Sequence, residues 1–513
     1  MSTAADTPCV ILGSGLDALV AAVVLARRGW KSLILEPAQA PFGIHRSETI
    51  IDGFRTAGLL DDSEGVQNSV LRALGFRSHS GILREAPLPH FIPEPKGAGL
   101  CFGEPAPAVV TRLKHRPGTT LPEYERWLSV HRHARRLAAS IVDGVATDLE
   151  HPLRHHVGHA LASVSTRKEH RIAFARALPM SLLDHLDDAF SDPLLKAALA
   201  CHALLGTPYG PRAAGTTLYP MLLQALRTHG VVGGTTALAA RALNQALSLG
   251  CELRLGQDIK RILIRNNRVT DVLLSSGQRI ATTRVLSTID PKKTIFELLE
   301  PRERPPELAD LCHWKCNGNV GVVHFALRER PRFLPYRNHV FHRLTLVESM
   351  EQLESAARSV KHGDLPGELP LHIRVPSVED PSLAPDGQHV MTVLFSPIPY
   401  GPIGGWPPAW IAALKNQVLT QLNRAAPDLQ GLILGEQWLL PRDLEERYGL
   451  TGGHLFGGDL TLDQFHFLRP HPLLAQGATP VEGLYLAGPG LHPGGHFPGA
   501  SGLLTGKRMR SEP

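Results

Sequence analysis

The chain has 513 residues, 43% of them apolar and 20% charged, which is long enough for two or more domains with a large buried core. A formal net charge of +5, without basic runs interleaved with aromatic residues, excludes nucleic acid as a partner. Six scattered cysteines are too few for a disulfide framework and favour a reducing environment.

The first motif is a strand, a glycine turn, a helix and a second strand, over residues 9–12, 13–18, 19–28 and 31–35. Gly13 permits the tight turn, and Gly15 lets the backbone approach a pyrophosphate at the helix N-terminus. Ala18 replaces the third glycine of the motif and keeps the helix close to the strand. Glu36 ends the second strand, where an acid accepts hydrogen bonds from a ribose diol. The pattern predicts a dinucleotide cradle but does not separate FAD from NAD.

The turn and the first helical turn also contain Leu16 and Asp17, and we assign both to the predicted cofactor site. A carboxylate at the position of Asp17 suits the helix dipole. It would repel a nearby phosphate unless the side chain points away.

The middle of the chain is predicted to be largely helical, over residues 124–146, 181–205 and 408–426, with a break at Pro193. Residues 320–327 and 390–395 look like strands of a sheet behind these helices. Nine leucines line a substrate tunnel or form ordinary core: Leu183, Leu186, Leu194, Leu195, Leu199, Leu204, Leu205, Leu222 and Leu223. The Pro-rich segment 397–408 is either a lid or a rigid surface crossing.

Histidines and cysteines at helical spacing do not predict a metal site. His155 and His159 have i, i+4 spacing, but no acid completes an H-E-x-x-H pattern. Cys312 and Cys316 have no second pair downstream. We therefore expect no metal.

Two later segments return to the α/β pattern of the first motif. Gly233 and Gly234 open a helix, and alternating strands follow it, joined by a turn at Asn266 and Asn267. Near the end of the chain, a strand over residues 483–488 leads into a loop rich in glycine and proline over residues 489–502. A last short helix follows this loop.

Residues 1–40, residues 233–299 and the terminal loop together resemble the phytoene-desaturase-like FAD-dependent oxidoreductases. The likeness is greatest to the subgroup named pyridine nucleotide-disulphide oxidoreductase domain 2, which segments 443–454, 458–459, 462–464 and 467–470 also fit. The resemblance implies FAD, because a nicotinamide enzyme does not need a second glycine-rich loop near its C-terminus. The free N–H groups of that loop can solvate a reduced, anionic flavin.

The resemblance also implies an α/β fold with two domains. A Rossmann-type, glutathione-reductase-like FAD-binding domain would be assembled from the discontinuous segments 1–75, 229–300 and 471–513. An α+β substrate-binding domain with a helical cap would comprise residues 76–228 and 301–470. Glu36 would bind the adenosine ribose, and the backbone of Ile259 would bind the adenine. The phosphate or isoalloxazine end would contact the terminal loop at Gly488, Gly490, Phe497 and Pro498.

The chain departs from the family pattern at two places. Many relatives have a glycine pair just after the ribose acid, whereas this chain has Phe42 and Gly43 followed by residues 44–46 with the sequence Ile-His-Arg. We keep Gly43 as a predicted cofactor contact. His496 stands in the terminal loop where similar proteins usually have a glycine, so this change bears on the site itself.

Few catalytic side chains are required, because the flavin accepts the hydride while the protein orients the substrate and manages one proton. The candidates are His496, His492, His454, Asp459 and Arg469. His496 and His492 lie in the loop expected beside the ring, where a histidine either titrates near neutral pH or is simply structural. Arg469 is alternatively an ion-pair partner of Asp459 or Asp463.

Together these patterns predict an FAD-dependent dehydrogenase or desaturase that oxidises a C–C or C–N bond of a mostly apolar or amphipathic small molecule. The alternatives are an amine or amide oxidase using oxygen, a nicotinamide-linked dehydrogenase, and a non-catalytic carrier resembling the Rab GDP-dissociation inhibitors. The substrate (an isoprenoid, an amine or a carrier-bound group), the electron acceptor, the oligomeric state and peripheral docking on a membrane or carrier protein stay open.

The start of the chain bears on location. Met1 to Pro8 lacks the basic and apolar regions of a signal peptide. No apolar stretch is long enough to predict a transmembrane helix. We therefore expect a cytoplasmic protein.

Overall fold

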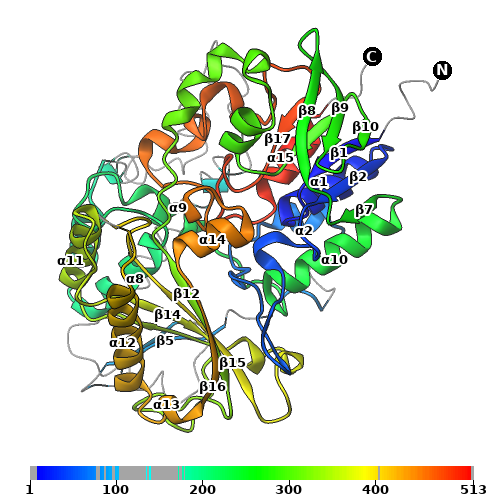
Figure 1. The fold of residues 1–513 in the computed structure, drawn as a ribbon. Helices are drawn as coiled ribbons and strands as arrows, with labels where there is room; N and C mark the ends of the chain where they lie inside the picture. The colour runs from blue at the N-terminus through cyan, green and yellow to red at the C-terminus, as the bar shows by residue number, and fades with distance from the viewer. Residues whose placement is uncertain are drawn as a thin grey trace.

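The computed structural model describes residues 8–76, 81–85, 88–94, 97, 99–102, 179–402 and 405–509, with a few positions between 135 and 177. Within these residues the chain forms a mixed α/β structure with two main sheets (Figure 1). The helix expected over residues 124–146 lies mostly outside the described residues, and His155 and His159 lie outside them entirely.

The first sheet is parallel and has five strands in the order β17-β11-β1-β2-β7. Its strands are β1 (Cys9–Leu12), β2 (Ser32–Glu36), β7 (Glu252–Leu255), β11 (Val285–Ser287) and β17 (Leu484–Leu486). Short apolar runs next to glycine turns are typical of buried parallel strands. Three segments that are distant in the sequence therefore meet in one sheet, and their carboxyl ends share one edge.

Helices cover one face of this sheet, and an antiparallel meander covers the other. Three helices share an apolar cluster with Cys9 and Ile11 of β1: α1 (Leu16–Ala26), α10 (Gly234–Ser248) and α15 (Ala500–Arg508). Three strands share a second cluster with Val10 and Leu12: β8 (Ile259–Arg265), β9 (Arg268–Leu274) and β10 (Arg279–Ala281). Successive residues of β1 thus face opposite layers, as the period of two in a strand requires.

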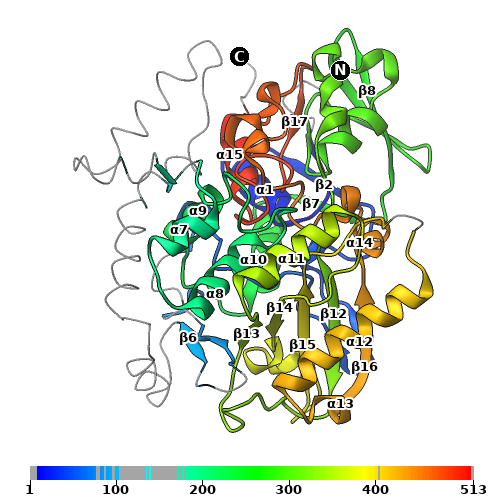
Figure 2. The ribbon, with the colours of Figure 1, turned by 90° about the vertical axis from the view of Figure 1, so that its left-hand side faces the viewer.

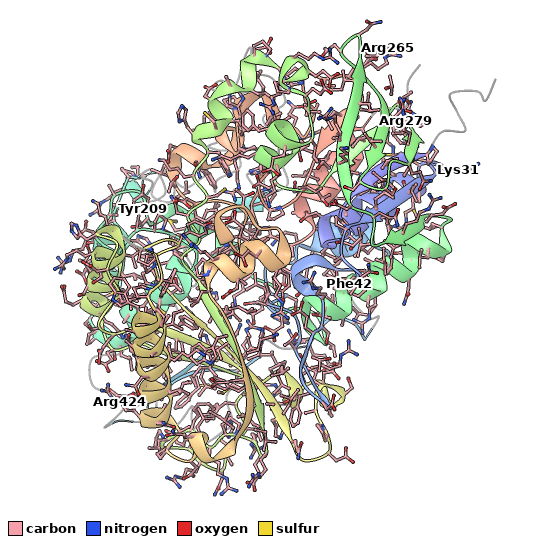
Figure 3. All side chains as sticks on the ribbon, viewed as in Figure 1. Lys31, Phe42, Tyr209, Arg265, Arg279 and Arg424 are labelled. Carbon is pink, nitrogen blue, oxygen red and sulfur yellow. The ribbon has the colours of Figure 1, made fainter. Side chains whose placement is uncertain are left out.

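The hairpin between β8 and β9 turns at Asn266 and Asn267, as predicted. Both asparagines have a positive φ, 52° and 58°. Tight hairpin turns need this conformation, and asparagine tolerates it better than most residues. Figure 3 shows Arg265 at the tip of this hairpin, far from the second sheet.

α1 and α15 approach each other closely because small residues face one another. A Cβ at Gly502 would lie 1.9 Å from the carbonyl oxygen of Asp17, so only glycine fits there. Ala18 is fully buried in the cluster that these two helices share. It therefore keeps the helix packed closely, as the sequence predicts, without facing any ligand.

The second sheet has seven strands in the order β16-β12-β15-β14-β13-β5-β6. Its strands are β5 (His90–Ile92), β6 (Leu100–Phe102), β12 (Gly321–Leu327), β13 (Arg343–Leu346), β14 (Leu371–Arg374), β15 (His389–Phe395) and β16 (Ile433–Leu439). All neighbours are antiparallel except β13 and β5. β12 and β15 confirm the strands predicted at residues 320–327 and 390–395.

Helices flank the second sheet on both sides. α12 (Pro408–Ala425), which confirms a predicted helix, and α13 (Leu429–Leu432) share an apolar cluster with Leu344, Ile373 and Val393 of the sheet. α7 (Leu182–Asp187), α8 (Pro193–Leu204), α9 (Leu218–Leu226) and α11 (Met350–Lys361) lie on the other side (Figure 2). Pro193 is the first residue of α8, so the predicted break is confirmed.

Shorter elements connect these layers. They are β3 (Thr49–Ile51), β4 (Phe54–Arg55), α2 (Asn68–Ala73) and α14 (Pro441–Tyr448). The loop after β4 and the segment after α14 both reach the space between the two main sheets, where the cavity described next is found.

Candidate functional site

A continuous cavity of about 730 Å³ is lined by residues of both main sheets. This volume is typical of a small-molecule or cofactor pocket. We name its three parts by what lines them. The cradle side contains Gly13, Ser14, Gly15, Leu16, Asp17, Glu36, Gly43 and Ile259. The loop side contains His454, Gly488, Gly490, Gly495, His496 and Pro498. The sheet side contains residues of α7, α8 and α9, of β5, β6, β13, β14 and β15, and Asp61, Asp62 and Glu64 of the segment after β4.

The glycines of the cradle side serve two different purposes. Gly13 has a φ of +90°, and a Cβ there would lie 2.7 Å from Thr288 Oγ1, so the protein itself requires glycine. Gly15 has an ordinary φ of −64°, and nothing lies within 4 Å of a Cβ built on it. No protein atom therefore requires a glycine at this position. The open space fits a ligand that approaches the backbone at the start of α1, as a pyrophosphate does.

Glu36 is fixed at the wall of the cradle side by the turn before α1. Its Oε2 accepts hydrogen bonds from the backbone N–H (2.9 Å) and the hydroxyl (2.6 Å) of Ser14, and its Oε1 accepts one from the N–H of Ala38 (3.0 Å). The Ser14 hydroxyl in turn accepts from the Phe42 N–H at 3.0 Å. Ser14 thus holds the Glu36 carboxylate in place, a role that sequence reasoning missed.

Asp17 points toward α15 rather than toward a ligand phosphate. Its Oδ1 accepts a hydrogen bond from the N–H of Gly502 at 2.9 Å, in the first turn of that helix. Burial raises the pKa of this carboxyl to about 6, against the opposing effect of the N–H groups of Gly502, Gly499 and Ser501. The repulsion considered from sequence is therefore reduced, and Asp17 caps a second helix.

In the loop that follows β2, a residue with a side chain adopts a backbone conformation that usually requires glycine. Phe42 has a φ of +86° and a ψ of 2°, a left-handed conformation that costs a side-chain-bearing residue ~1–2 kcal/mol. Figure 3 shows Phe42 in the loop between the two main sheets. The next residue, Gly43, lies so near the start of α1 that its Cβ would be 3.8 Å from Gly15 Cα. The loop geometry is thus retained even though the family's glycine pair is not.

Arg469 fixes the start of the terminal loop against the segment of residues 456–464. The guanidinium of this fully buried residue donates to five carbonyl oxygens, of Phe456, Gly458, Asp459, Gln464 and Pro489, at 2.9–3.5 Å. Its side chain does not line the cavity. The proposed ion pair with the Asp459 or Asp463 carboxylate is absent from the described residues, since Asp463 pairs with Lys315 and Asp459 offers its carbonyl. Arg469 therefore shapes the site without touching its contents.

His454 and His496 line the loop side of the cavity, whereas His492, Asp459 and Phe497 do not. His496 stacks on Phe456 with a centroid separation of 3.8 Å. Asp459 stands behind His454, with Oδ1 3.5 Å from His454 Nε2, and it accepts a backbone hydrogen bond from Asn317 at 2.9 Å. His492 is buried edge-on against His466.

The two cavity histidines do not titrate near neutral pH, which corrects the expectation from sequence. Burial, and after it the charge of the nearby Arg469, lowers the pKa of His454 and of His496 to about 3. Both rings are therefore neutral at physiological pH. Each then offers one hydrogen-bond donor and one acceptor but no charge.

The leucines predicted to line a tunnel divide into two groups. Leu186, Leu199, Leu205 and Leu223 line the cavity, while Leu183, Leu194, Leu195, Leu204 and Leu222 do not. Helical periodicity marks an apolar face but does not say whether a neighbouring helix or a ligand covers it.

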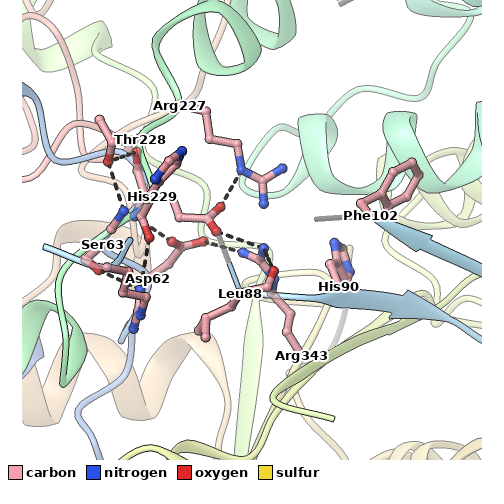
Figure 4. A network of polar contacts seen from close by, with 12 residues as sticks. Asp62, Ser63, Leu88, His90, Phe102, Arg227, Thr228, His229 and Arg343 are labelled. Atoms are coloured by element: carbon pink, nitrogen blue, oxygen red, sulfur yellow. Dashed lines mark hydrogen bonds and ion pairs between the residues drawn. The ribbon is translucent and has the colours of Figure 1, made fainter. Parts of the chain in front are cut away.

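The sheet side also contains a charged network that sequence reasoning missed. Asp61, Asp62 and Glu64 follow β4 and meet Arg227, Arg343 and Arg374 in the cavity wall. Figure 4 shows Arg227 and Arg343 approaching the acids, with His90 beside Arg343. The alternation of apolar and polar residues in β14 was the available signal, because such a pattern marks a strand with one polar face. Here that face is turned to the cavity rather than to bulk solvent.

The curated relatives of the chain agree with the resemblance seen in its sequence motifs. No family model matches the chain. The pyridine nucleotide-disulfide oxidoreductase domain-containing protein 2 of Rattus norvegicus is 26% identical, over 96% of this chain and 91% of that protein. The neurosporene-forming phytoene desaturase of Cereibacter sphaeroides is 24% identical, over 98% and 94%.

Solved structures share the fold. An oxidoreductase from Methanosarcina mazei has a TM-score of 0.58 at 15% identity, over 97% of this chain and 98% of that one. Cyclohexylamine oxidase from Brevibacterium oxydans has a TM-score of 0.55 at 13% identity, over 98% and 97%.

The fold, the cradle and these relatives define an FAD-dependent oxidoreductase. Within that class the chain is phytoene-desaturase-like, in agreement with the resemblance seen in its sequence motifs. Among the described helices, none combines the length and the hydropathy that crossing a membrane requires. The cytoplasmic location stays a prediction.

Proposed function

We propose that FAD lies along the cradle side and reaches the loop side, in a Rossmann-type, glutathione-reductase-like domain made of residues 1–75, 229–300 and 471–513. Three features support this placement. The first turn of α1 has no side-chain cap, so its N–H groups are available to a pyrophosphate. Gly15 leaves space for that group, and Glu36 is fixed beside it. A non-catalytic carrier would have no use for this open space.

We further propose that the enzyme removes two hydrogens from a C–C or C–N bond of an amphipathic small molecule. The observation that supports this most is the continuity of the cavity from the terminal loop into the part lined by Leu186, Leu199 and Leu223. Bound FAD supplies the hydride acceptor in such a reaction. Residues 76–228 and 301–470 would then form the substrate-binding domain, which orients the bond to be oxidised.

His454 and His496 act in this proposal as neutral groups that position the substrate. A base with a pKa of about 3 is a poor proton acceptor at neutral pH, because general-base catalysis is most efficient near the operating pH. The stacking of His496 on Phe456 fixes its ring plane against the cavity. In a C–N oxidation the proton therefore stays on the substrate nitrogen, and in a C–C oxidation it leaves to a water molecule rather than to these rings.

Anaerobic mixing tests the proposal. The purified yellow protein is mixed without oxygen with isoprenoids, amines and amphipathic acids, and the flavin absorbance near 450 nm is followed. Loss of the yellow band with one class identifies the reaction. Protein that stays colourless after incubation with FAD would refute the placement, and a Gly15→Val variant serves as the matched control that blocks the open space.

An amine oxidase is the second candidate, because cyclohexylamine oxidase shares the fold over nearly the whole chain. Steady release of hydrogen peroxide in air with an amine substrate would favour it. A dehydrogenase would instead need an added electron acceptor to turn over.

A further inference from the structure

The sheet side of the cavity contains three histidines from three different elements. His90 lies on β5, His202 on α8 and His372 on β14, and all three line the cavity. The ring of His202 lies between the other two, with centroids 6.3 Å from each. Together with the acids and arginines of the same wall, this cluster indicates a polar subsite.

Two of the three rings are fixed by hydrogen bonds within the protein. His90 Nε2 pairs with the Thr345 hydroxyl at 2.8 Å, and the same hydroxyl lies 3.4 Å from His372 Nδ1. His372 Nε2 lies 3.4 Å from Cys201 Sγ. Among the described residues, His202 makes no hydrogen bond to the protein. His202 lines the cavity, so its ring is available to a ligand.

The acids of the sheet side are all engaged by arginines. Glu64 accepts from Arg343 at 2.9 Å and also from Arg227. Asp61 and Asp62 pair with Arg374 at 2.9 and 2.7 Å. A cationic ligand would therefore compete with these arginines for acceptors that are already used.

Among the arginine donors, by contrast, one has no hydrogen-bond partner in the described part of the chain. The buried Nε of Arg343 has no hydrogen-bond partner among the described residues. The arginines also affect the rings electrostatically. Burial, and after it the charge of Arg343, holds the pKa of His90 well below its usual range. Burial, and after it the charge of Arg227, does the same to the pKa of His202. The arginine charges beside these rings favour an oxyanion over a cation.

An apolar path leads from His202 to the loop side. His202 lies in the last turn of α8, and Leu205 directly follows that helix. His496 lies against the backbone of Leu205. Leu199 and Leu223 line the same stretch of the cavity. A molecule bound at His202 by a polar group would thus extend an apolar chain toward the terminal loop.

We propose that the sheet side is a carboxylate subsite, in which His202 hydrogen-bonds the head group of an amphipathic carboxylic acid. The inference rests on the proposed function for the direction in which the apolar chain extends. The subsite itself rests on the geometry of His90, His202 and His372 and on the arginines beside them. The substrate class is therefore an acid with an apolar chain rather than a pure hydrocarbon or an amine.

Calorimetric titration of the FAD-loaded enzyme tests this proposal with octanoate, octanol and octylamine at pH 7. We expect octanoate to bind at least about tenfold more tightly than the other two, because hydrogen bonds to a charged group are the stronger ones. Equal affinities, or tighter binding of octylamine, would overturn the carboxylate assignment.

Substitutions at His202 test whether this residue binds the octanoate carboxylate. His202→Phe should weaken octanoate binding about tenfold or more, while His202→Gln, which keeps a donor, should weaken it less. His185→Gln, at another histidine of the cavity wall, should change it less than twofold. Retention of bound FAD shows that each variant is folded. Unchanged octanoate affinity in folded His202→Phe would remove His202 from the subsite.

The pH dependence gives an independent readout. A carboxylate beside the rings raises their pKa, so binding takes up a proton and strengthens as the pH falls from 8 to 5.5. The groups that face His202 are Asp62, Arg227, Arg343, His90 and His372. Of these, the two histidines share the expected uptake. Binding heats that are the same in two buffers of different ionisation enthalpy would contradict it.

The two proposals fail in different ways. If octanoate binds as expected but no acid bleaches the flavin, the proposed reaction on an acid is wrong while the subsite stands. If an amine or a hydrocarbon bleaches the flavin and octanoate does not bind, the subsite is wrong while the oxidoreductase chemistry stands.

Discussion

Replacement of Asp17 by asparagine should stabilise the apoprotein at alkaline pH, although it removes a charge from a helix N-terminus. The Asp17 carboxylate accepts from Gly502 N–H in the first turn of α15, a helix with no side-chain cap of its own. Burial nevertheless raises the pKa of the carboxyl to about 6, so the desolvation cost exceeds the gain from the helix N–H groups. An asparagine amide keeps an acceptor for these N–H groups without the charge.

The expected gain in the free energy of unfolding follows from the shift in the pKa of Asp17. The pKa rises from 3.8 to about 6, and each unit corresponds to ~1.4 kcal/mol, which gives an upper limit of about 3 kcal/mol. Because the side chain also faces the cavity, where water screens it, we expect ~1–3 kcal/mol. The folded state holds the proton more tightly than the unfolded chain does. The wild type therefore gains stability as the pH falls from about 6 toward 4, and Asp17→Asn does not.

Denaturant unfolding of both apoproteins between pH 4.5 and 8 measures this difference. We expect Asp17→Asn to be the more stable protein at pH 8 and its advantage to fall to about a third at pH 4.5, because the unfolded carboxyl is protonated only below about pH 3.8. Asp17→Ala is the control, because it removes the acceptor as well as the charge and should lose about 1 kcal/mol relative to the asparagine variant. A lower stability of Asp17→Asn at pH 8, with the wild-type pH dependence intact, would refute the reasoning.

Three further substitutions test the rest of the site. Glu36→Gln should weaken FAD binding about tenfold or more, measured by quenching of FAD fluorescence, because the charged acceptor of the Ser14 and Ala38 N–H groups is lost; an unchanged affinity would contradict this. Arg469→Met should lower the free energy of unfolding by more than about 3 kcal/mol, since five carbonyls lose a donor, whereas a stable variant that binds FAD but has lost flavin reduction would indicate a direct role. His496→Gln should leave the pH profile of flavin reduction unchanged between pH 6 and 9, because burial has already lowered the pKa of the ring to about 3; loss of a titration near pH 6.5 in the variant would show the opposite.

Local patterns predicted the parts of the fold that depend on neighbouring residues. The turn from Gly13 to Ala18, the break at Pro193 and the hairpin at Asn266 each depend on the backbone conformation of a few consecutive residues, which glycine, proline and asparagine control. Sequence reasoning also placed Glu36 at the end of β2, because the spacing of this motif is set by one helix and two strands.

These local patterns did not predict contacts between residues that are distant in the sequence. Asp62 and Arg374 are more than 300 positions apart in the numbering, and no local rule joins them. The same holds for Arg469, which the sequence suggested as a catalytic group or an ion-pair partner and which instead binds backbone carbonyls of two distant loops. Burial also changed the chemistry of His496, since a pKa depends on the surroundings of a ring rather than on its type.

The charged network of the sheet side is difficult to explain as a source of stability alone. Taking Glu64 and Arg343 out of water costs several kcal/mol per ion, and well-packed apolar residues of similar volume are often as stable or more so. The apolar cluster on the opposite face of the same strands shows that this chain has such residues in adjacent positions, for example Leu344 and Ile373. What the charges add is a polar wall in which each of these acids is already paired with an arginine, beside a His202 ring that has no hydrogen bond to the described residues. This arrangement has a use in recognising an anionic group, which is why the chemistry of the flavin end and the specificity of the sheet end are best tested separately.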